Sequence, residues 1–270
     1  MRVPLLAALL AQLAATAGVA QTYSTASPVP RTTSAPTLRA AAVRREIEER
    51  FSIGIDAEVR GDWAAAAGEF ERILALRPAE PQGSTARYDL AIAYSNLGRN
   101  DDAARQLRAA IALDPGFLAA IANLISVDVA LGNLVEARKL AERYVTLAPD
   151  SARALYSRGI VALQIGDAAT AREDFGKLLH ENPSYAVAHY DLALAEERLG
   201  RYDSAERELR SALALAPAYA RARFALGVVL LREGEHGAAR NAFARATLDA
   251  AGDPALQNIA AAMRDSIRAP

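Results

Sequence analysis

Apolar residues along most of the chain recur at intervals of three and four positions, the spacing of one face of an α-helix. Between residues 84 and 117, Leu90, Ala91 and Tyr94 make up one such set, and a second set follows after a short polar stretch. Polar and charged residues occupy most of the positions between them. The pattern predicts an all-α chain built from short amphipathic helices.

The helical segments themselves repeat every 34 residues. Leu97–Pro115 reads LGRNDDAARQLRAAIALDP, and the segment that begins at Leu131 reads LGNLVEARKLAERYVTLAP. The same spacing of residues occurs twice more along the chain. One imperfect copy precedes these four units and another follows them. The preceding copy is separated from the next unit by a three-residue insertion, Pro81–Gly83. The chain therefore contains six units, which span 47–253 as 47–80, 84–117, 118–151, 152–185, 186–219 and 220–253.

Small or rigid residues mark three positions of the units, and positions are counted here from the first residue of each unit. A glycine at position 15 ends the first helix, where a left-handed backbone conformation costs little only for glycine. An alanine at position 20 lets the second helix approach the first, and a proline at position 32 of the first five units stops the second helix. The glycines are Gly61, Gly98, Gly132, Gly166, Gly200 and Gly234, and the alanines are Ala66, Ala103, Ala137, Ala171, Ala205 and Ala239.

This pattern resembles the tetratricopeptide repeat, a 34-residue helix-turn-helix unit. The resemblance implies a right-handed superhelical solenoid of about six repeats, because one helix pair cannot bury its apolar face alone and must stack on neighbours. The third unit departs from the pattern, with Ile125 where the other units have glycine or alanine, and with Asp128 and Ala141 where large residues are usual. We expect its helix pair to be the most loosely packed, or the most altered for binding.

Both ends of the repeat array have their own character. Residues 254–268 read as a capping helix that covers the last repeat, with Asp253 as its N-cap and Pro254 in its first turn. Residues 1–20 combine Arg2, an apolar run too short to span a bilayer and small residues before Gln21, which is typical of a cleaved Sec-type signal peptide. Residues 21–40 are rich in Ser, Thr and Pro and predict a disordered linker. We therefore expect a periplasmic or secreted protein.

Composition excludes several functions. The formal net charge is −1, which gives no basic footprint for nucleic acid or for an anionic membrane surface. The chain has no cysteine, so disulfides, thiol catalysis, thiolate metal sites and lipid attachment to a cysteine are excluded. No catalytic set, metal-ligand spacing or nucleotide-binding motif is present, and the chain has only three histidines. The sequence predicts a protein that is not an enzyme, has no cofactor and no metal, and has no transmembrane span.

The resemblance also indicates a binding surface, because positions 2, 5, 9, 12 and 13 of first helices line the concave groove in this family. Five of the six residues at position 5 are aromatic, and these rings also suit packing within the repeat. Arginines stand at positions 2 and 13 of the last three units, whereas Glu48, Glu58 and Asp89 stand near the groove in the first two. The predicted partner-binding residues are Phe51, Tyr88, Tyr156, Tyr190, Phe224, Arg153, Arg198, Arg221 and Arg232.

We expect a protein-interaction scaffold or adaptor in a bacterial cell envelope that binds a peptide or helix of a protein partner in this groove. The arginines would hold a carboxylate-bearing segment, unless Asp191 and Glu197 neutralise them. The alternative function is a non-catalytic auxiliary subunit of an envelope polysaccharide or peptidoglycan enzyme complex. The sequence leaves the partner's identity and the oligomeric state open.

Overall fold

The computed structural model describes residues 35–267, which form thirteen α-helices and no strand within that range. The predicted signal peptide, and the predicted linker up to residue 34, lie outside these residues. Residues 1–42 and 43–270 are separate compact units, and the first is described only at residues 35–42. The helices are α2 (Ala35–Val59), α3 (Trp63–Ala75), α4 (Gln82–Asn96), α5 (Asn100–Leu113), α6 (Leu118–Ala130), α7 (Leu134–Leu147), α8 (Ala152–Ile165), α9 (Ala168–Glu181), α10 (Ala186–Arg198), α11 (Tyr202–Leu215), α12 (Ala220–Arg232), α13 (His236–Asp249) and α14 (Pro254–Ser266).

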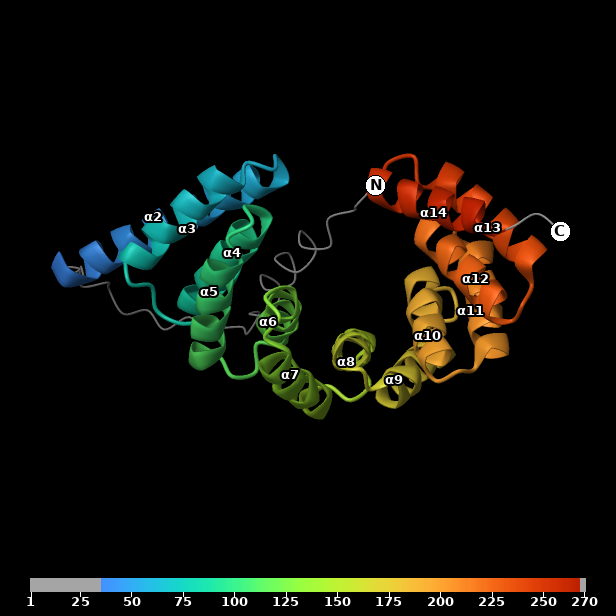
Figure 1. Ribbon diagram of the computed structural model, residues 1–270. Helices are drawn as coiled ribbons and strands as arrows, with labels where there is room; N and C mark the ends of the chain where they lie inside the picture. The colour runs from blue at the N-terminus through green and yellow to red at the C-terminus, as the bar shows by residue number, and fades with distance from the viewer. Residues whose placement is uncertain (1–34, 268–270) are drawn as a thin grey trace, which may run out of the picture. The chain divides into compact units, whose positions relative to one another are not determined.

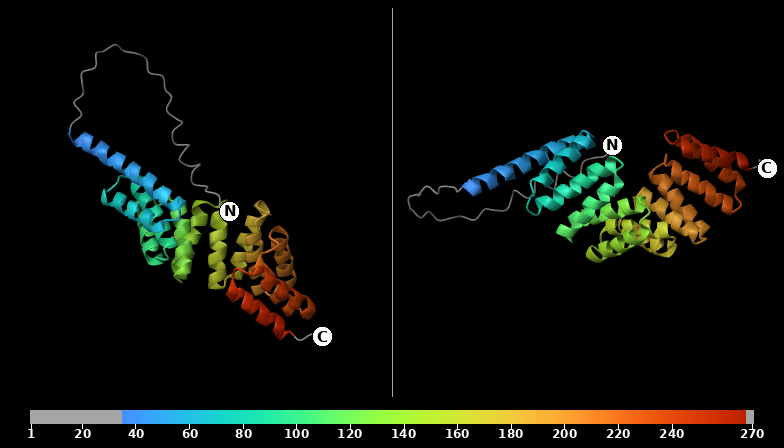
Figure 2. Two further views of the ribbon diagram at one scale, coloured as in Figure 1. Left: turned by 90° about the horizontal axis from the view of Figure 1, so that it is seen from above. Right: turned by 60° about the vertical axis from the view of Figure 1, so that its left-hand side comes forward.

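The helices of residues 43–270 succeed one another as pairs, one pair to each predicted repeat. From α3 onward, each helix packs against the next one along the chain, and α14 packs against α13. Figures 1 and 2 show this row of helices from three directions. The all-α helical repeat that the sequence predicts is therefore confirmed.

The turn inside each pair has the conformation that its glycine predicts. All six glycines at position 15 have a positive φ, between 72° and 86°. In each turn, the next residue donates its backbone N–H to a carbonyl five residues earlier, as Asp167 does to Ala162 at 2.8 Å. That hydrogen bond satisfies a carbonyl at the helix end. A residue with a side chain in place of the glycine would be strained, because its backbone would have to adopt a positive φ.

Inside each pair, the two helices meet through residues of complementary size. The six alanines at position 20 are fully buried. Three repeats have glycine at position 8 and phenylalanine at position 24, and a Cβ on Gly54, Gly159 or Gly227 would lie 2.6 to 2.8 Å from the phenylalanine ring. Each of these rings is completely buried, which stabilises its repeat by about 2–3 kcal/mol. Alanine faces leucine at the same two positions of the second and fifth repeats.

The third repeat uses the same two positions in the opposite order. Ile125 occupies the glycine position, Ala141 occupies the phenylalanine position, and both are buried. Asp128 is fully buried too, and it accepts hydrogen bonds from Arg108 at 2.6 Å and from Asn133 at 3.1 Å. A large residue on the first helix thus accompanies a small one on the second. Helices α6 and α7 nonetheless contact each other less than the helices of any other repeat from α4 to α13, which agrees with the expectation that this pair is the most loosely packed.

Two helix boundaries differ from the sequence predictions. Residues 35–40, placed in the linker, already belong to α2, because Pro36 is tolerated in a first helical turn and the alanines at 40–42 favour a helix. Helix α4 begins at Gln82, so two residues of the expected insertion Pro81–Gly83 extend that helix. At the other end, Asp253 caps α14 as predicted, by accepting from the backbone N–H of Leu256 at 3.1 Å.

Candidate partner-binding surface

The first helices of the repeats contact one another across repeat boundaries. Helix α8 contacts both α6 and α10, and α10 also contacts α12. In Figure 1, α6, α8 and α10 lie along the inner side of the row, and α7, α9 and α11 lie outside them. We call the solvent-facing sides of α4, α6, α8, α10, α12 and of residues 43–59 of α2 the inner surface.

The predicted aromatic residues are half-buried, and each one packs against a second ring. Each aromatic pair contributes about 0.5–1.5 kcal/mol to the stability of the fold and fixes the position of the ring. The part of each ring that is not buried faces solvent. The two roles considered for these rings, packing and binding, are therefore compatible. The ring centroids are 6.1 Å apart for Phe51 and Phe70, 5.0 Å for Tyr88 and Phe117, 5.8 Å for Tyr156 and Phe175, 5.2 Å for Tyr190 and Tyr219, and 5.3 Å for Phe224 and Phe243.

The four predicted arginines are exposed but differ in their contacts. Arg153 donates to the Asn123 side chain at 2.7 Å, and Arg198 donates to the carbonyl of Leu163. Within residues 35–267, Arg221 and Arg232 make no hydrogen bond and no ion pair. Two of the four guanidinium groups are thus engaged by the protein itself, and two are available to a ligand.

A polar chain links three repeats on this surface. Arg153 holds the carbonyl oxygen of the Asn123 side chain, and the amide nitrogen of Asn123 donates to the hydroxyl of Tyr88 at 3.2 Å. Asn123 lies on α6, between the helices that carry the other two residues. It directly follows Ala122, which is the one position-5 residue without a ring. Its bridging role was not predicted from the sequence.

Asp191 lies among four tyrosines. Its side chain is 6% exposed and accepts a hydrogen bond from Tyr156 at 2.9 Å. Burial raises the pKa of Asp191 to about 6, although the Tyr156 hydrogen bond lowers it in part. Asp191 was considered as a residue that could neutralise the arginines, but the partner of its side chain is the hydroxyl of Tyr156.

Two of these tyrosines were not predicted as site residues. Tyr185 packs against Tyr156 with ring centroids 5.7 Å apart, and Tyr219 packs against Tyr190. Burial, and then the charge of Asp191, raises the pKa of Tyr219 to about 12, so its hydroxyl remains protonated. Both residues occupy position 34, directly before a first helix. An aromatic residue recurs there in the second repeat as Phe117, and this recurrence is the signal from which they could have been predicted.

A second acidic site lies at the other end of the inner surface. Asp89 is 6% exposed and makes no hydrogen bond or ion pair within the described part of the chain. The Oε1 atom of Glu58 on α2 is buried and also has no hydrogen-bond partner. Burial and repulsion by Glu58 raise the pKa of Asp89 to about 7, and burial raises the pKa of Glu58 to about 7. Two carboxyl groups therefore lie together here without a counter-ion.

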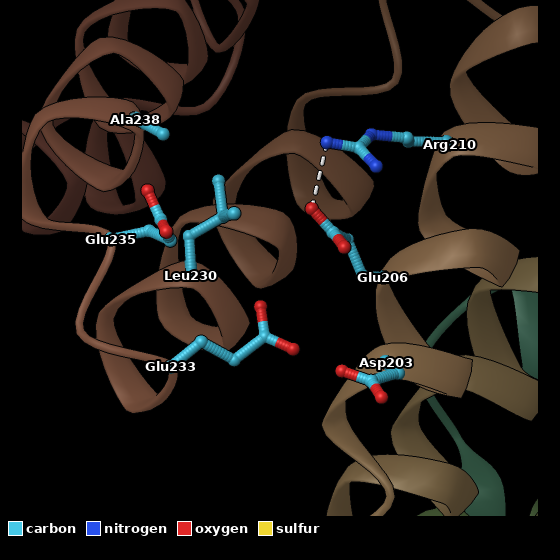
Figure 3. A pocket seen from close by; sticks show the side chains of 7 residues that line it. All are labelled: Asp203, Glu206, Arg210, Leu230, Glu233, Glu235 and Ala238. Carbon is cyan, nitrogen blue, oxygen red and sulfur yellow. Dashed lines mark ion pairs between the residues drawn. The ribbon is translucent and has the colours of Figure 1, made fainter.

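An open pocket of about 620 Å³ lies on a different part of the array, between α11, α12 and α13 (Figure 3). Four of its seven lining residues are acidic, and Glu206 forms an ion pair with Arg210 at 2.7 Å. Burial raises the pKa of Glu233, and nearby carboxyl groups add to this shift. None of the lining residues belongs to the predicted site, and none is a nucleophile with an adjacent base.

The structure provides no indication of metal chemistry or membrane insertion in the residues it describes. No three His, Cys, Asp or Glu side chains between 35 and 267 are grouped to hold a metal ion. His189 bonds to Glu208 at 2.6 Å and to the carbonyl of Pro183 at 2.9 Å, so both ring nitrogens are occupied. None of the helices α2 to α14 has the length and apolar character needed to cross a bilayer.

Comparison with known sequences points to one family. One sequence profile of the tetratricopeptide repeat matches residues 51–116 and 190–254, and a second profile of the same repeat matches residues 98–158 and 162–212. Together the two profiles cover most of the six predicted repeats. A comparison with curated proteins gives no match.

Solved structures with the same arrangement of helices come from diverse proteins. A tetratricopeptide repeat protein from Parabacteroides merdae is 19% identical, with a TM-score of 0.66 over 82% of this chain and 98% of its own. MamA from Desulfovibrio magneticus is 19% identical, with a TM-score of 0.59 over 65% and 99%. A thermophilic repeat protein from Thermus thermophilus is 23% identical, with a TM-score of 0.58 over 67% and 98%. At these identities the likeness concerns the fold.

Proposed function

The chain belongs to the tetratricopeptide repeat family, and on that premise we propose that it is a protein-interaction scaffold that binds a segment of a partner protein along its inner surface. The family's repeats are generally non-catalytic interaction modules, and the sequence contains no catalytic set. The observation that carries the proposal is the row of half-buried rings, each fixed by a second ring. Rings fixed in this way lose little conformational freedom when they contact a ligand.

The arginines extend this proposal to the chemistry of the partner. Arg221 and Arg232 are exposed on α12, at the same end of the surface as Tyr190 and Phe224. A guanidinium group binds carboxylate with two parallel hydrogen bonds and can stack on a ring. The partner segment therefore presents an acidic side chain to α12 and apolar side chains to the rings.

We place the scaffold in a bacterial cell envelope, because residues 1–20 have the composition of an export signal. N-terminal sequencing of the protein from an envelope fraction tests this location. A mature chain that begins at Gln21 supports it, and an intact Met1 on cytoplasmic protein contradicts it.

Crosslinking in cells, followed by affinity purification and mass spectrometry, tests the function. The chain is compared with an inner-surface variant, Arg221→Gln with Arg232→Gln. The matched control is Arg172→Gln with Arg240→Gln, two exposed arginines on the second helices α9 and α13. We expect a discrete protein partner whose recovery falls at least tenfold for the inner-surface variant and is unchanged for the control.

Two other results are informative. Equal recovery with both variants would place the main contact away from α12. Retention on envelope glycan without any protein partner would overturn the scaffold proposal in favour of an auxiliary subunit of a polysaccharide or peptidoglycan enzyme complex.

A further inference from the structure

The first two repeats contain carboxyl groups that the fold leaves uncompensated. Glu58 is near the end of α2 at position 12, and Asp89 is on the neighbouring first helix at position 6. An unpaired buried carboxyl group destabilises the free protein, so its presence calls for a role that the fold alone does not provide.

The charged and polar groups around the two carboxyl groups are engaged with other partners. Arg153 reaches Asn123 and not Asp89, and the Tyr88 hydroxyl receives its hydrogen bond from Asn123. On α3, Glu71 already accepts a hydrogen bond from Tyr94 at 2.6 Å. Another carboxylate on α3, Glu69, is paired with Arg50 and Arg72. No arginine or lysine of the described residues forms an ion pair with Glu58 or Asp89, so a positive charge that neutralises their ionised forms has to come from another molecule.

We propose that Glu58 and Asp89 bind the cationic end of an arginine or lysine side chain from the partner segment. This inference rests on the proposed function and adds a second contact to it. A guanidinium or ammonium group supplies the hydrogen-bond donors that Asp89 and the Oε1 atom of Glu58 lack. The exposed side of the Tyr88 ring offers an aromatic face beside the cation.

The proposal gives the bound segment a direction. Its basic residue lies at the first two repeats, and its acidic residue lies at Arg221 and Arg232 in the last repeat. A segment with the opposite order of charges would place a carboxylate beside Glu58 and Asp89 and would be rejected by repulsion.

Small cations test the site without the partner. Isotope-labelled protein is titrated by NMR with ethylguanidinium chloride and butylammonium chloride, against sodium chloride at equal ionic strength. We expect saturable shifts in the backbone amides of Glu58 and Asp89, absent from the variant Glu58→Gln with Asp89→Asn. The matched control is Glu181→Gln, an exposed carboxylate on α9, which keeps the shifts.

Binding of the small cations must also depend on pH in a defined direction. Because both carboxyl groups must be ionised, affinity rises several-fold from pH 6 to pH 8 and then becomes constant. An affinity independent of pH, or shifts that persist in the double variant, overturns the site. Saturation by magnesium or calcium chloride at lower concentration than either organic cation overturns the assignment to a side chain and indicates a metal ion.

Peptide selection separates this inference from the proposed function. A phage-displayed library of random dodecapeptides is selected on the chain and on the double variant. Enrichment of arginine or lysine on the chain alone supports the inference. Peptides selected equally by both proteins, without basic residues, overturn it while leaving the scaffold intact. Failure to select any peptide counts against the scaffold, and the cation titration still decides the site.

Discussion

Replacing Asp89 by asparagine should stabilise the protein at neutral and alkaline pH. The exchange keeps the size and shape of the side chain and removes a buried charge that has no partner within the described residues. Most substitutions of buried polar groups destabilise a protein, so a gain in the free energy of unfolding would be diagnostic.

The size of the effect follows from the pKa of Asp89. That pKa rises from 3.8 to about 7, mainly through burial and then through repulsion by Glu58. At about 1.4 kcal/mol for each unit, ionisation destabilises the folded state by at most about 4 kcal/mol. An unpaired asparagine amide retains part of the desolvation cost, about 1–2 kcal/mol, which leaves an expected gain of about 2 kcal/mol.

The gain should depend on pH with a defined sign. Below about pH 3 the carboxyl group is protonated in both the folded and the unfolded chain, so its ionisation contributes nothing. Between pH 4 and 7 the unfolded chain loses its proton first, and the chain with Asp89 loses stability as pH rises. The advantage of asparagine therefore grows over this range and is constant above about pH 8.

Urea unfolding at pH 5, 6, 7 and 8, followed by far-UV circular dichroism, measures this difference. The control is Asp150→Asn, an exposed aspartate, which should change the free energy of unfolding by less than about 0.5 kcal/mol. A loss of more than about 1 kcal/mol in Asp89→Asn at pH 8 would refute the reasoning, since it would mean that the carboxylate has a stabilising partner. A gain of equal size at every pH would refute the electrostatic origin.

Three further predictions concern packing, hydrogen bonding and the end of the array. Gly159→Ala should destabilise the protein by about 1–3 kcal/mol, because the new Cβ would overlap the Phe175 ring. Adding Phe175→Leu should restore most of this loss, and urea denaturation of the single and double variants measures the interaction energy between the two positions. Tyr156→Phe should raise the pKa of Asp191 above about 6, because it removes the hydrogen bond that favours the carboxylate. Carbon-13 NMR of the Asp191 carboxyl group measures this pKa, and an unchanged or lower titration midpoint would contradict the prediction. Truncation after Asp253 should increase amide hydrogen exchange first in α12 and α13, and uniform loss of protection over all repeats would argue against a linear array.

The fold was predictable because it depends on local rules repeated six times. The glycine at position 15 allows the left-handed turn that ends the first helix, and the proline at position 32 ends the second helix. Both effects are local and do not depend on neighbouring repeats. The looser packing of the third repeat follows from its departures from the pattern, since α6 and α7 contact each other less than the helices of any other repeat from α4 to α13. The sequence does not show that Ile125 and Ala141 fit together and are both buried. Their compatibility is a property of two helices in contact, which a count of large and small residues in each helix does not reveal.

The candidate site was predictable in part. The family resemblance implies that position 5 of each first helix faces the groove, and in the structure the predicted aromatic residues are half-buried on those helices. The burial of Asp89 could not be predicted, because it depends on how closely α2 and α4 approach each other. Tyr185 and Tyr219 were missed because they precede their helices and fall outside the positions considered.

The matched sizes at positions 8 and 24 have a consequence for how such a chain can be rearranged. If an exchange between repeats occurred inside the turn, it would join the first helix of one repeat to the second helix of another. The helix of Gly159 would then face Ala141 across an empty space, while Ile125 would collide with Phe175, and either junction would cost several kcal/mol. An exchange in the loop between repeats keeps each matched pair together. The element that this chain can duplicate, delete or trade is therefore the complete helix pair, and the loops between repeats are the places where an engineer should cut.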